Sequence, residues 1–181
     1  MKTYLLAAFA LQLLISCGNN ENRNDTAANP NDTLKTTTYY LIRHAEKDRS
    51  GKGNSDPNLT NKGVQRAKKW AVYFKGKKIE AVYTTNYNRT RQTASYTAQM
   101  ARVPVKTYDP TKLYSAAFKA ATWGKTVLVV GHSNTTPQFV NAIIGENKYS
   151  NIPDNENNWL FKVTLTANGK TKVQKTTVGK R

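Results

Sequence analysis

Two histidines are the only imidazole side chains in the chain, and each directly follows a run of β-prone and apolar residues. His44 comes after the run at residues 38–43, and His132 comes after the run at residues 126–131. A neutral imidazole nitrogen can attack phosphorus and carry the phosphoryl group as a covalent intermediate. A second imidazole can donate a hydrogen bond to the phosphoryl oxygens. The two side chains therefore suggest phosphoryl transfer through histidine.

Two arginines are placed to hold the phosphoryl group in such a reaction. Arg43 directly precedes His44, and Arg89 follows the next predicted strand and opens a helix. The planar guanidinium fork binds oxyanions through two parallel hydrogen bonds, and helix N-termini after strands add backbone donors. The arginines supply the positive charge, and two histidines without a Cys or carboxylate cluster make a weak metal site. We therefore expect no metal and no cofactor.

The order of predicted elements indicates an α/β fold that brings these residues to one edge of a sheet. Strands are expected at residues 38–42, 79–83, 103–108 and 126–130. One helix is expected to begin after a cap at Thr60, and three more are expected at residues 88–100, 112–122 and 138–144. Residues 159–166 and 171–178 are expected to form a hairpin that turns at Asn168-Gly169. This order predicts a three-layer sandwich with a mostly parallel central sheet plus a C-terminal hairpin. Ligands of such sheets bind beyond the carboxyl ends of the strands.

The composition fits an anion-binding domain. The chain of 181 residues carries 28 Lys and Arg against 11 Asp and Glu, a formal net charge of +17. Such a charge attracts phosphorylated molecules, nucleic acid or acidic lipid headgroups without choosing among them. Residues 36–181 are long enough for one folded domain with its own core.

The first 35 residues are predicted to lie outside that domain. Residues 1–16 have the basic start and short apolar core of a signal peptide, and the ending at Cys17, the only cysteine, resembles a bacterial lipobox. Residues 17–35 are Asn-rich and almost devoid of apolar side chains, which indicates a disordered tether. We expect lipidation of Cys17 and a location in the bacterial cell envelope, on the periplasmic or outer-membrane side. An ordinary secretory signal or an N-terminal anchor helix remains the alternative.

Four motifs in order carry a resemblance to a known family. They are Tyr40-Leu41-Ile42-Arg43-His44-Ala45-Glu46, the segment 59–67 (LTNKGVQRA), the segment 84–94 (TTNYNRTRQTA) and the segment 127–135 ending in Gly131-His132-Ser133-Asn134-Thr135. The spacing of Gln65 departs from the family pattern by one residue. Together the motifs resemble the histidine phosphatase (phosphoglycerate mutase-like) superfamily, in its short SixA-like branch. The resemblance extends over residues 38–166.

The resemblance implies a role for each motif residue. It makes His44 the nucleophile and Arg43, Arg89 and His132 the phosphate pocket. It further implies that Asn88 and the backbone around Ser133 assist substrate binding.

The general acid that protonates the leaving group is the least defined member of the predicted site. Family members often carry an acid after the third strand, where this chain has Asp109, and we expect Asp109 to serve. Asp109-Pro110 is also an ordinary turn opener. Glu46 is expected to orient a loop, while Asp154 and Glu156 lie in a polar loop that can reach over the pocket. The family also has short members without an obvious acid, which agrees with substrates such as phosphohistidine whose leaving groups are good.

The predicted function is a phosphatase that hydrolyses phosphate monoesters or phosphohistidine. Its substrate would be a phosphorylated small molecule, a glycolipid or a phosphoprotein, with a membrane contact through Cys17 and no nucleic acid. A phosphomutase is the alternative within the family, but it needs a closed pocket built by long insertions, and the connections here are short.

Two other classes of protein remain as alternatives. A non-catalytic polyanion-binding lipoprotein would suit the tail at residues 170–181, which has five cations and no acid. A serine esterase with Ser133 as nucleophile is disfavoured, because Thr135 replaces the glycine of that turn and no histidine follows.

Overall fold

The computed structural model describes residues 35–179. The predicted signal peptide, Cys17 and all of the tether except Lys35 lie outside the described residues. The elements are β1 (Thr37–Arg43), α1 (Asn61–Phe74), β2 (Ala81–Thr84), α2 (Asn88–Ala101), β3 (Val105–Thr107), α3 (Ala116–Thr122), β4 (Thr126–Gly131), α4 (Thr135–Ile144), β5 (Trp159–Leu165) and β6 (Thr171–Thr177).

The strands form one sheet in the order β3-β2-β4-β1-β5-β6. The four strands β3, β2, β4 and β1 run parallel, and the terminal hairpin β5–β6 adds two antiparallel strands. The predicted α/β fold with a mostly parallel sheet and a C-terminal hairpin is therefore confirmed.

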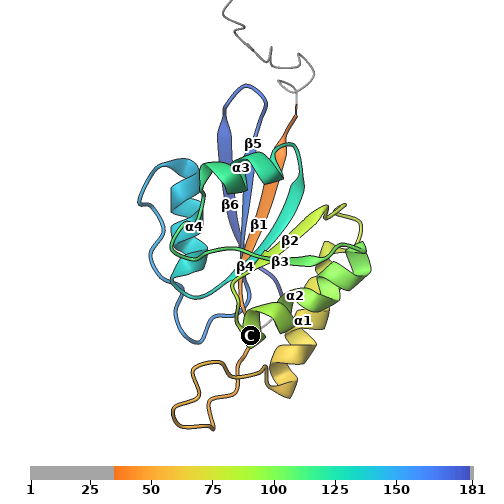
Figure 1. Ribbon diagram of the computed structural model, residues 1–181, viewed down its shortest axis with the longest axis vertical. Helices are drawn as coiled ribbons and strands as arrows, with labels where there is room; N and C mark the ends of the chain where they lie inside the picture. Colours follow the sequence, from red (N-terminus) through yellow and green to blue (C-terminus); the bar gives the residue numbers. More distant parts are fainter. Residues whose placement is uncertain (1–34, 180–181) are drawn as a thin grey trace, which may run out of the picture.

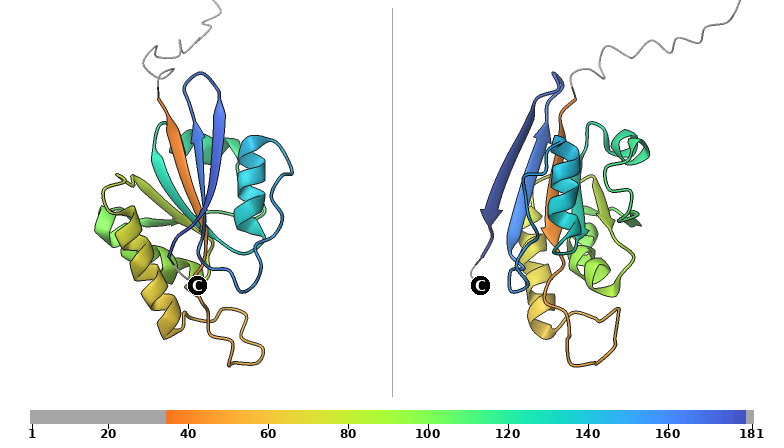
Figure 2. Two further views of the ribbon diagram at one scale, coloured as in Figure 1. Left: turned by 180° about the vertical axis from the view of Figure 1, so that it is seen from behind. Right: turned by 90° about the vertical axis from the view of Figure 1, so that its left-hand side faces the viewer.

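Helices cover both faces of the sheet and make it the middle of three layers. On one face, α1 and α2 lie side by side and bury Trp70, Phe74 and Ala98 against β1, β2 and β4. On the other face, α3 and α4 bury Phe118 and Phe139. Figure 1 shows α4 on the opposite side of the strands from the α1–α2 pair, and Figure 2 shows β6 at the free edge of the sheet.

Local capping explains where two of the helices begin. Thr60 caps α1 as predicted, because its hydroxyl oxygen accepts a hydrogen bond from the Gly63 amide at 3.1 Å. The helix predicted at residues 112–122 is shorter than expected. It begins only at Ala116, because the hydroxyl of Ser115 accepts from the Phe118 amide at 3.2 Å and starts the helix there.

The last helix begins earlier than its predicted start at residue 138. Helix α4 starts at Thr135, so that Pro137 falls within its first turn. A proline in the first turn costs no intrahelical hydrogen bond, because the amides there have no helical acceptor. Pro137 therefore marks the beginning of α4 and does not interrupt it.

The carboxyl ends of the parallel strands gather at one end of the molecule. Strand β1 runs downward in Figure 1, and the loop that follows it lies at the bottom of that view. The β5–β6 turn and the start of β1 lie at the opposite end. Within residues 35–179, no helix has the length and apolar character needed to cross a membrane.

Candidate active site

The pairing register of two central strands brings the histidines together. In the parallel pair of β1 and β4, Arg43 is the partner of Gly131, and the His44 amide donates to the Gly131 carbonyl at 2.9 Å. His44 and His132 are the next residues of the two strands, so they lie next to each other beyond the sheet edge. Their ring centroids are 5.5 Å apart with an interplanar angle of 68°. The two rings are therefore in edge-to-face contact, and a phosphoryl group would have to lie beside the pair.

Gly131 leaves room for the groups that shape this turn. A Cβ atom at this position would lie 2.8 Å from the Thr135 hydroxyl, 2.9 Å from the Tyr108 hydroxyl and 3.0 Å from the Thr136 hydroxyl. The Thr135 hydroxyl accepts a hydrogen bond from the His132 amide at 2.9 Å. A side chain at Gly131 would therefore disturb the backbone of His132.

His44 is buried and held with one nitrogen free. Its Nδ1 lies 2.7 Å from the Ala45 carbonyl, an acceptor, so Nδ1 carries the hydrogen and Nε2 presents its lone pair. Asn157 donates to the His44 carbonyl at 2.9 Å, and Thr93 accepts from the Ala45 amide at 2.9 Å. Burial lowers the pKa of His44 to about 3, and the charge of Arg43 adds to the effect. The imidazole is therefore neutral at physiological pH, as a nucleophile requires.

A chain of buried hydroxyl groups fixes the orientation of His132. The Thr85 hydroxyl donates to Thr90 Oγ1 at 3.1 Å, and Thr90 in turn donates to the Thr85 carbonyl at 2.8 Å. The Thr85 oxygen, 2.8 Å from His132 Nε2, is thus left to accept from an Nε2–H group. His132 Nδ1 then faces Arg89 Nη2 at 3.4 Å as an acceptor. Burial lowers the pKa of His132 to about 4, with Arg89 as the second cause.

Arg43 is clamped by the loop between α4 and β5. Its Nη1 donates to the carbonyls of Pro153, Asp154 and Glu156 at 3.0, 3.0 and 3.1 Å. Its Nη2 donates to Asp154 Oδ1 at 2.6 Å, while Arg49 binds the other carboxylate oxygen at 2.7 Å. The guanidinium is therefore rigidly oriented and 3% exposed.

Arg89 is held from three sides at the start of α2. Its Nη1 donates to the Ser55 carbonyl at 3.3 Å and lies 3.6 Å from Asp56 Oδ1. Its guanidinium carbon lies 4.3 Å from the ring centroid of Tyr87, in cation–π geometry. The ring of Tyr87 also meets His132 edge-on, with 5.1 Å between centroids. Tyr87 thus supports both Arg89 and His132.

Arg43 and Arg89 each keep one buried donor without a partner in the part of the chain that the structure describes. The Nε atoms of Arg43 and Arg89 are buried, and their N–H groups donate to no acceptor among the described residues. Buried donors are nearly always paired, so an unpaired one at a concave site calls for a ligand acceptor. Guanidinium groups beside two neutral imidazoles are chemically suited to bind an oxyanion.

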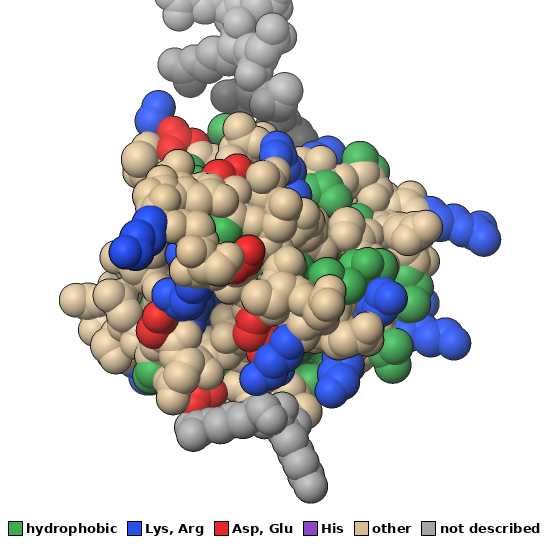
Figure 3. Space-filling model, turned by 90° about the horizontal axis from the view of Figure 1, so that it is seen from below, with side chains coloured by type: hydrophobic (Ala, Val, Ile, Leu, Met, Phe, Trp, Pro, Cys, Tyr) green, Lys and Arg blue, Asp and Glu red, His purple; other side chains and the backbone are tan. Residues whose placement is uncertain are grey.

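Two hollows flank the histidine pair. The first, about 270 Å³, is lined by Arg43, His44 and basic side chains of the β1–α1 region. The second, about 380 Å³, is lined by Tyr87, Arg89 and His132. Figure 3 views this end of the molecule and shows basic and acidic side chains interspersed over it. Among residues 35–179, no three His, Cys, Asp or Glu side chains gather as a metal site would require.

The structure does not bring Asp109 into this cluster. Its carboxylate is exposed and accepts hydrogen bonds from the Thr111 amide and hydroxyl at 2.8 and 2.7 Å. Those bonds lower the pKa of Asp109, whereas a general acid needs a raised pKa. Asp109 lines neither of the two hollows. The Asp-Pro pair instead opens a turn, which was the competing interpretation of this dipeptide.

The two assisting residues expected from the motifs have other partners. The Asn88 side chain accepts from Arg91 at 2.8 Å, and its amide nitrogen lies 3.4 Å from the Asp56 carbonyl. Ser133 holds the α4–β5 loop, because its carbonyl accepts from the Ile152 amide at 2.8 Å. Both residues therefore fasten loops around the site.

Three contributors were not singled out from the sequence. Thr85 orients His132, Asn157 binds the His44 carbonyl, and Asp56 faces Arg89. Thr85 directly follows β2, so the rule that drew attention to His44 and His132 also applies to it. Asp56 and Asn157 lie in loops and give no comparable signal.

Comparison with known proteins agrees with this geometry. The family model of the histidine phosphatase superfamily (branch 1) matches residues 39–110. No curated protein matches the chain. The predicted resemblance is thus confirmed over the first two motifs and the arginine segment that follows them.

Solved structures share the fold at low sequence identity. The protein histidine phosphatase SixA complexed with tungstate is 22% identical, with a TM-score of 0.62 over 77% of this chain and 96% of that one. Phosphoglycerate mutase from Bacillus anthracis is 14% identical, with a TM-score of 0.60 over 81% and 95%. A mycobacterial glucosyl-3-phosphoglycerate phosphatase is 11% identical, with a TM-score of 0.61 over 80% and 100%. The fold is therefore phosphoglycerate mutase-like.

Proposed function

We propose that this chain is a phosphatase of the histidine phosphatase superfamily that transfers a phosphoryl group to His44 and then to water. The observation that carries the proposal is a pair of neutral imidazoles, His44 buried and His132 half-buried, beside two guanidinium groups that each have a buried Nε–H without a partner among residues 35–179. The SixA structure, which shares this fold, holds tungstate, an oxyanion of phosphate-like shape.

The proposed reaction has two steps. His44 Nε2 attacks phosphorus, the bond from phosphorus to the leaving group breaks, and the leaving group takes a proton from water or from the substrate itself. Arg43 and Arg89 donate from Nε to the non-bridging oxygens, whose negative charge is held by donors already in place. Water then attacks the phosphohistidine, releases inorganic phosphate and restores neutral His44. The positive charge of the arginines makes a metal unnecessary in this scheme.

The carboxylates around the site favour substrates with good leaving groups. Burial alone would raise the pKa of Glu46, but hydrogen bonds from Arg66 outweigh it and lower that pKa. Hydrogen bonds from Arg43 and Arg49 lower the pKa of Asp154. No carboxyl group with a raised pKa lines either hollow within residues 35–179, so protonation of a poor leaving group has no evident donor. Phosphohistidine and aryl phosphates need little such help.

The short connections favour hydrolysis over mutase chemistry. Both hollows reach the protein surface, so water can approach a phosphohistidine at His44. A mutase retains the phosphoryl group by excluding water from its pocket.

We propose in addition that lipidation of Cys17 tethers the domain to the bacterial cell envelope. The support is the sequence pattern ending at Cys17 and the basic charge of the domain. Metabolic labelling with a fatty acid should mark the wild-type protein and not a Cys17→Ser variant, and labelling of both would contradict the anchor.

Phosphate release from p-nitrophenyl phosphate in the presence of EDTA tests the catalytic proposal. We expect activity in the wild type and a loss of at least about 1000-fold in His44→Gln, because the covalent route disappears. Asp109→Asn serves as the matched control and should remain active. Activity that requires a metal, or that survives in folded His44→Gln, would overturn the proposal.

Acid-labile phosphoenzyme provides a second readout. When the reaction with a phosphate-labelled substrate is quenched rapidly, the label should be found on His44. The bond between His44 and the phosphoryl group should be stable in base and labile in acid. An acid-stable adduct on another residue would contradict the assigned nucleophile.

A further inference from the structure

The hollow beside His44 contains more positive charge than the transfer of one phosphoryl group requires. Its charged lining consists of five cations and two carboxylates: Arg43, Lys47, Arg49, Lys62 and Arg66 against Glu46 and Asp154. Arg43 binds the phosphoryl group in the proposed reaction. The remaining cations need another explanation.

Both carboxylates are already bound by guanidinium groups. Arg66 binds Glu46 through Nε at 3.0 and 2.9 Å and through Nη2 at 2.7 Å. Asp154 is shared between Arg43 and Arg49 at 2.6 and 2.7 Å. With every carboxylate oxygen engaged, the lining retains an excess of three positive charges. An anion entering this hollow therefore meets cations without displacing a strong ion pair.

Lys47 is the cation with the least compensation. Among residues 35–179, no carboxylate oxygen lies within 4.0 Å of its ammonium group. Burial lowers the pKa of Lys47, and the charges of Arg89 and Arg49 add to this effect. The backbone of Lys47 is fixed by a β-bridge to Leu59, whose amide donates to Gln92 Oε1 at 2.8 Å. An ammonium group that extends from a fixed backbone into a positive field stabilises an anion brought next to it.

Lys62 faces the same hollow from the first turn of α1. Its ammonium lies 3.8 Å from Glu46 Oε1, a contact weaker than those of Arg66, and its side chain is 70% exposed. It can reach a ligand without losing a short hydrogen bond. Asn155 and Asn157 add neutral amide groups to the wall.

We propose that this hollow is a subsite for a second anionic group, a phosphate or carboxylate that the substrate carries next to the phosphoryl group being transferred. Lys47 and Lys62 bind that group while Arg43 and Arg89 hold the first. The volume of about 270 Å³ suits such a group and is small for a bulky apolar leaving group. The inference rests on the proposed function and narrows its substrates to phosphorylated molecules that carry a second anionic group.

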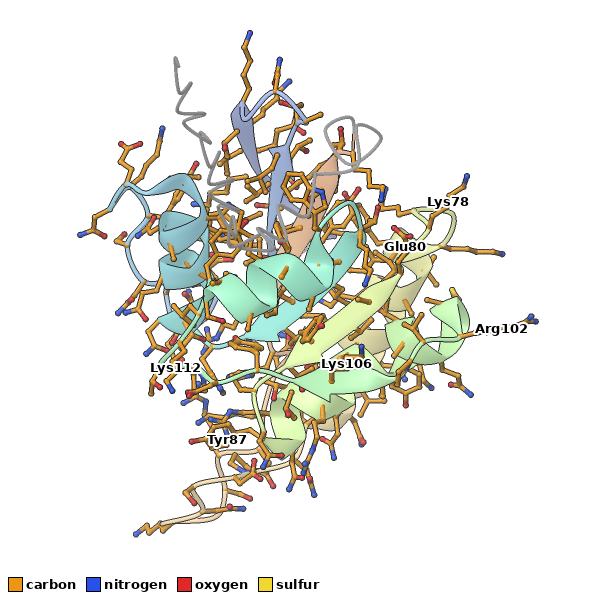
Figure 4. The ribbon with its side chains drawn as sticks, turned by 45° about the horizontal axis from the view of Figure 1, so that its top comes forward. Lys78, Glu80, Tyr87, Arg102, Lys106 and Lys112 are labelled. Carbon is orange, nitrogen blue, oxygen red and sulfur yellow. The ribbon has the colours of Figure 1, made fainter. Side chains whose placement is uncertain are left out.

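Equilibrium binding tests the subsite without relying on turnover. The dissociation constants of inorganic phosphate and of methylenediphosphonate, which carries two linked phosphonates and is not hydrolysed, are measured by calorimetry for the whole folded domain with its N-terminal tether, residues 18–181. The strands and helices that the structure describes lie within 35–179, so this chain retains all of them. The Lys47→Gln/Lys62→Gln variant is compared with Lys78→Gln/Lys106→Gln. The control pair is exposed, carries the same charge change and lies away from Tyr87 in Figure 4.

The ratio of the two dissociation constants is the deciding quantity. We expect the wild type to bind methylenediphosphonate more tightly than phosphate. In the Lys47→Gln/Lys62→Gln variant this preference should fall about tenfold, because each exposed ion pair contributes up to about fivefold to an affinity. The control pair should leave the ratio unchanged. An unchanged ratio in Lys47→Gln/Lys62→Gln, or an equal loss in the control, would overturn the subsite. A domain that keeps the preference but hydrolyses no phosphate ester would refute the phosphatase and leave the subsite standing.

Discussion

Removal of the Thr85 hydroxyl should damage both stability and catalysis. In Thr85→Val the shape of the side chain is kept, but the acceptor for His132 Nε2–H is lost. His132 cannot recover by moving its hydrogen to Nδ1, because Nδ1 lies 3.4 Å from Arg89 Nη2, which is itself a donor. Thr90 keeps its own acceptors in the carbonyls of Thr85 and Tyr87. The substitution therefore leaves one buried imidazole N–H unpaired.

The size of the effect follows from that single unpaired donor. A buried donor without a partner costs about 1–3 kcal/mol of unfolding free energy. For a domain of this length, the melting temperature should fall by about 3–9 °C. If one such hydrogen bond is also lost from the transition state, kcat/KM should fall about tenfold, since 1.36 kcal/mol corresponds to a factor of ten.

Thr85→Ser is the matched control, because it keeps the hydroxyl and loses only a methyl group. Its cost should be about 1 kcal/mol of stability, with kcat/KM close to that of the wild type. Chemical denaturation and the hydrolysis of p-nitrophenyl phosphate measure the two quantities. If Thr85→Val matches the wild type, or if Thr85→Ser loses as much activity as Thr85→Val, the hydroxyl does not orient His132.

Three further predictions concern other parts of the site. The folded-state pKa values of His44 and His132, about 3 and about 4, lie below the unfolded value near 6.5, so the unfolded chain binds more protons in acid and stability falls as the pH drops below 6.5. Between pH 7 and 4.5 each histidine should lower the free energy of unfolding by about 2–3 kcal/mol. Urea denaturation should show that the free energy of unfolding of His44→Gln falls less steeply with decreasing pH than that of the wild type. Gly63→Ala should destabilise the domain by more than about 3 kcal/mol in the same denaturation assay, because its Cβ would lie 2.2 Å from the Glu46 carbonyl oxygen; an unchanged midpoint would contradict this contact. Asp109→Asn should change kcat less than about twofold, and a large loss would return this residue to the role of general acid.

The strand ends could be predicted from the sequence because local pattern and topology agree there. The short, β-branched apolar runs that end in Arg43-His44 and Gly131-His132 are typical of buried strands. Parallel strands place their carboxyl ends together. Arg89 follows by the same rule, since it opens the helix after β2. These four site residues, and the fact that they lie close together, can therefore be predicted without knowledge of long-range contacts.

The remaining features depend on contacts that no local pattern records. The clamp on Arg43 comes from a loop without periodic structure, and Asp56 reaches Arg89 from another such loop. For Asp109 the position relative to the third strand was right, but the hydrogen bonds to Thr111 decided where its carboxylate points. The start of α3 was misplaced for a similar reason, because Ser115 caps the helix after a turn that reads as helical.

The clamp on Arg43 also determines when the site can come into being. Strand β1 is made first, yet in the sheet it lies between β4 and β5, and Arg43 contacts carbonyls 110 to 113 residues further along the chain. Contacts of such large sequence separation form late, because the intervening chain must first be closed into a loop. A nascent chain that has not yet reached Glu156 lacks part of the clamp, although both histidines are already present. The proposed catalytic centre thus assembles only after the α4–β5 loop has been synthesised, long after both histidines.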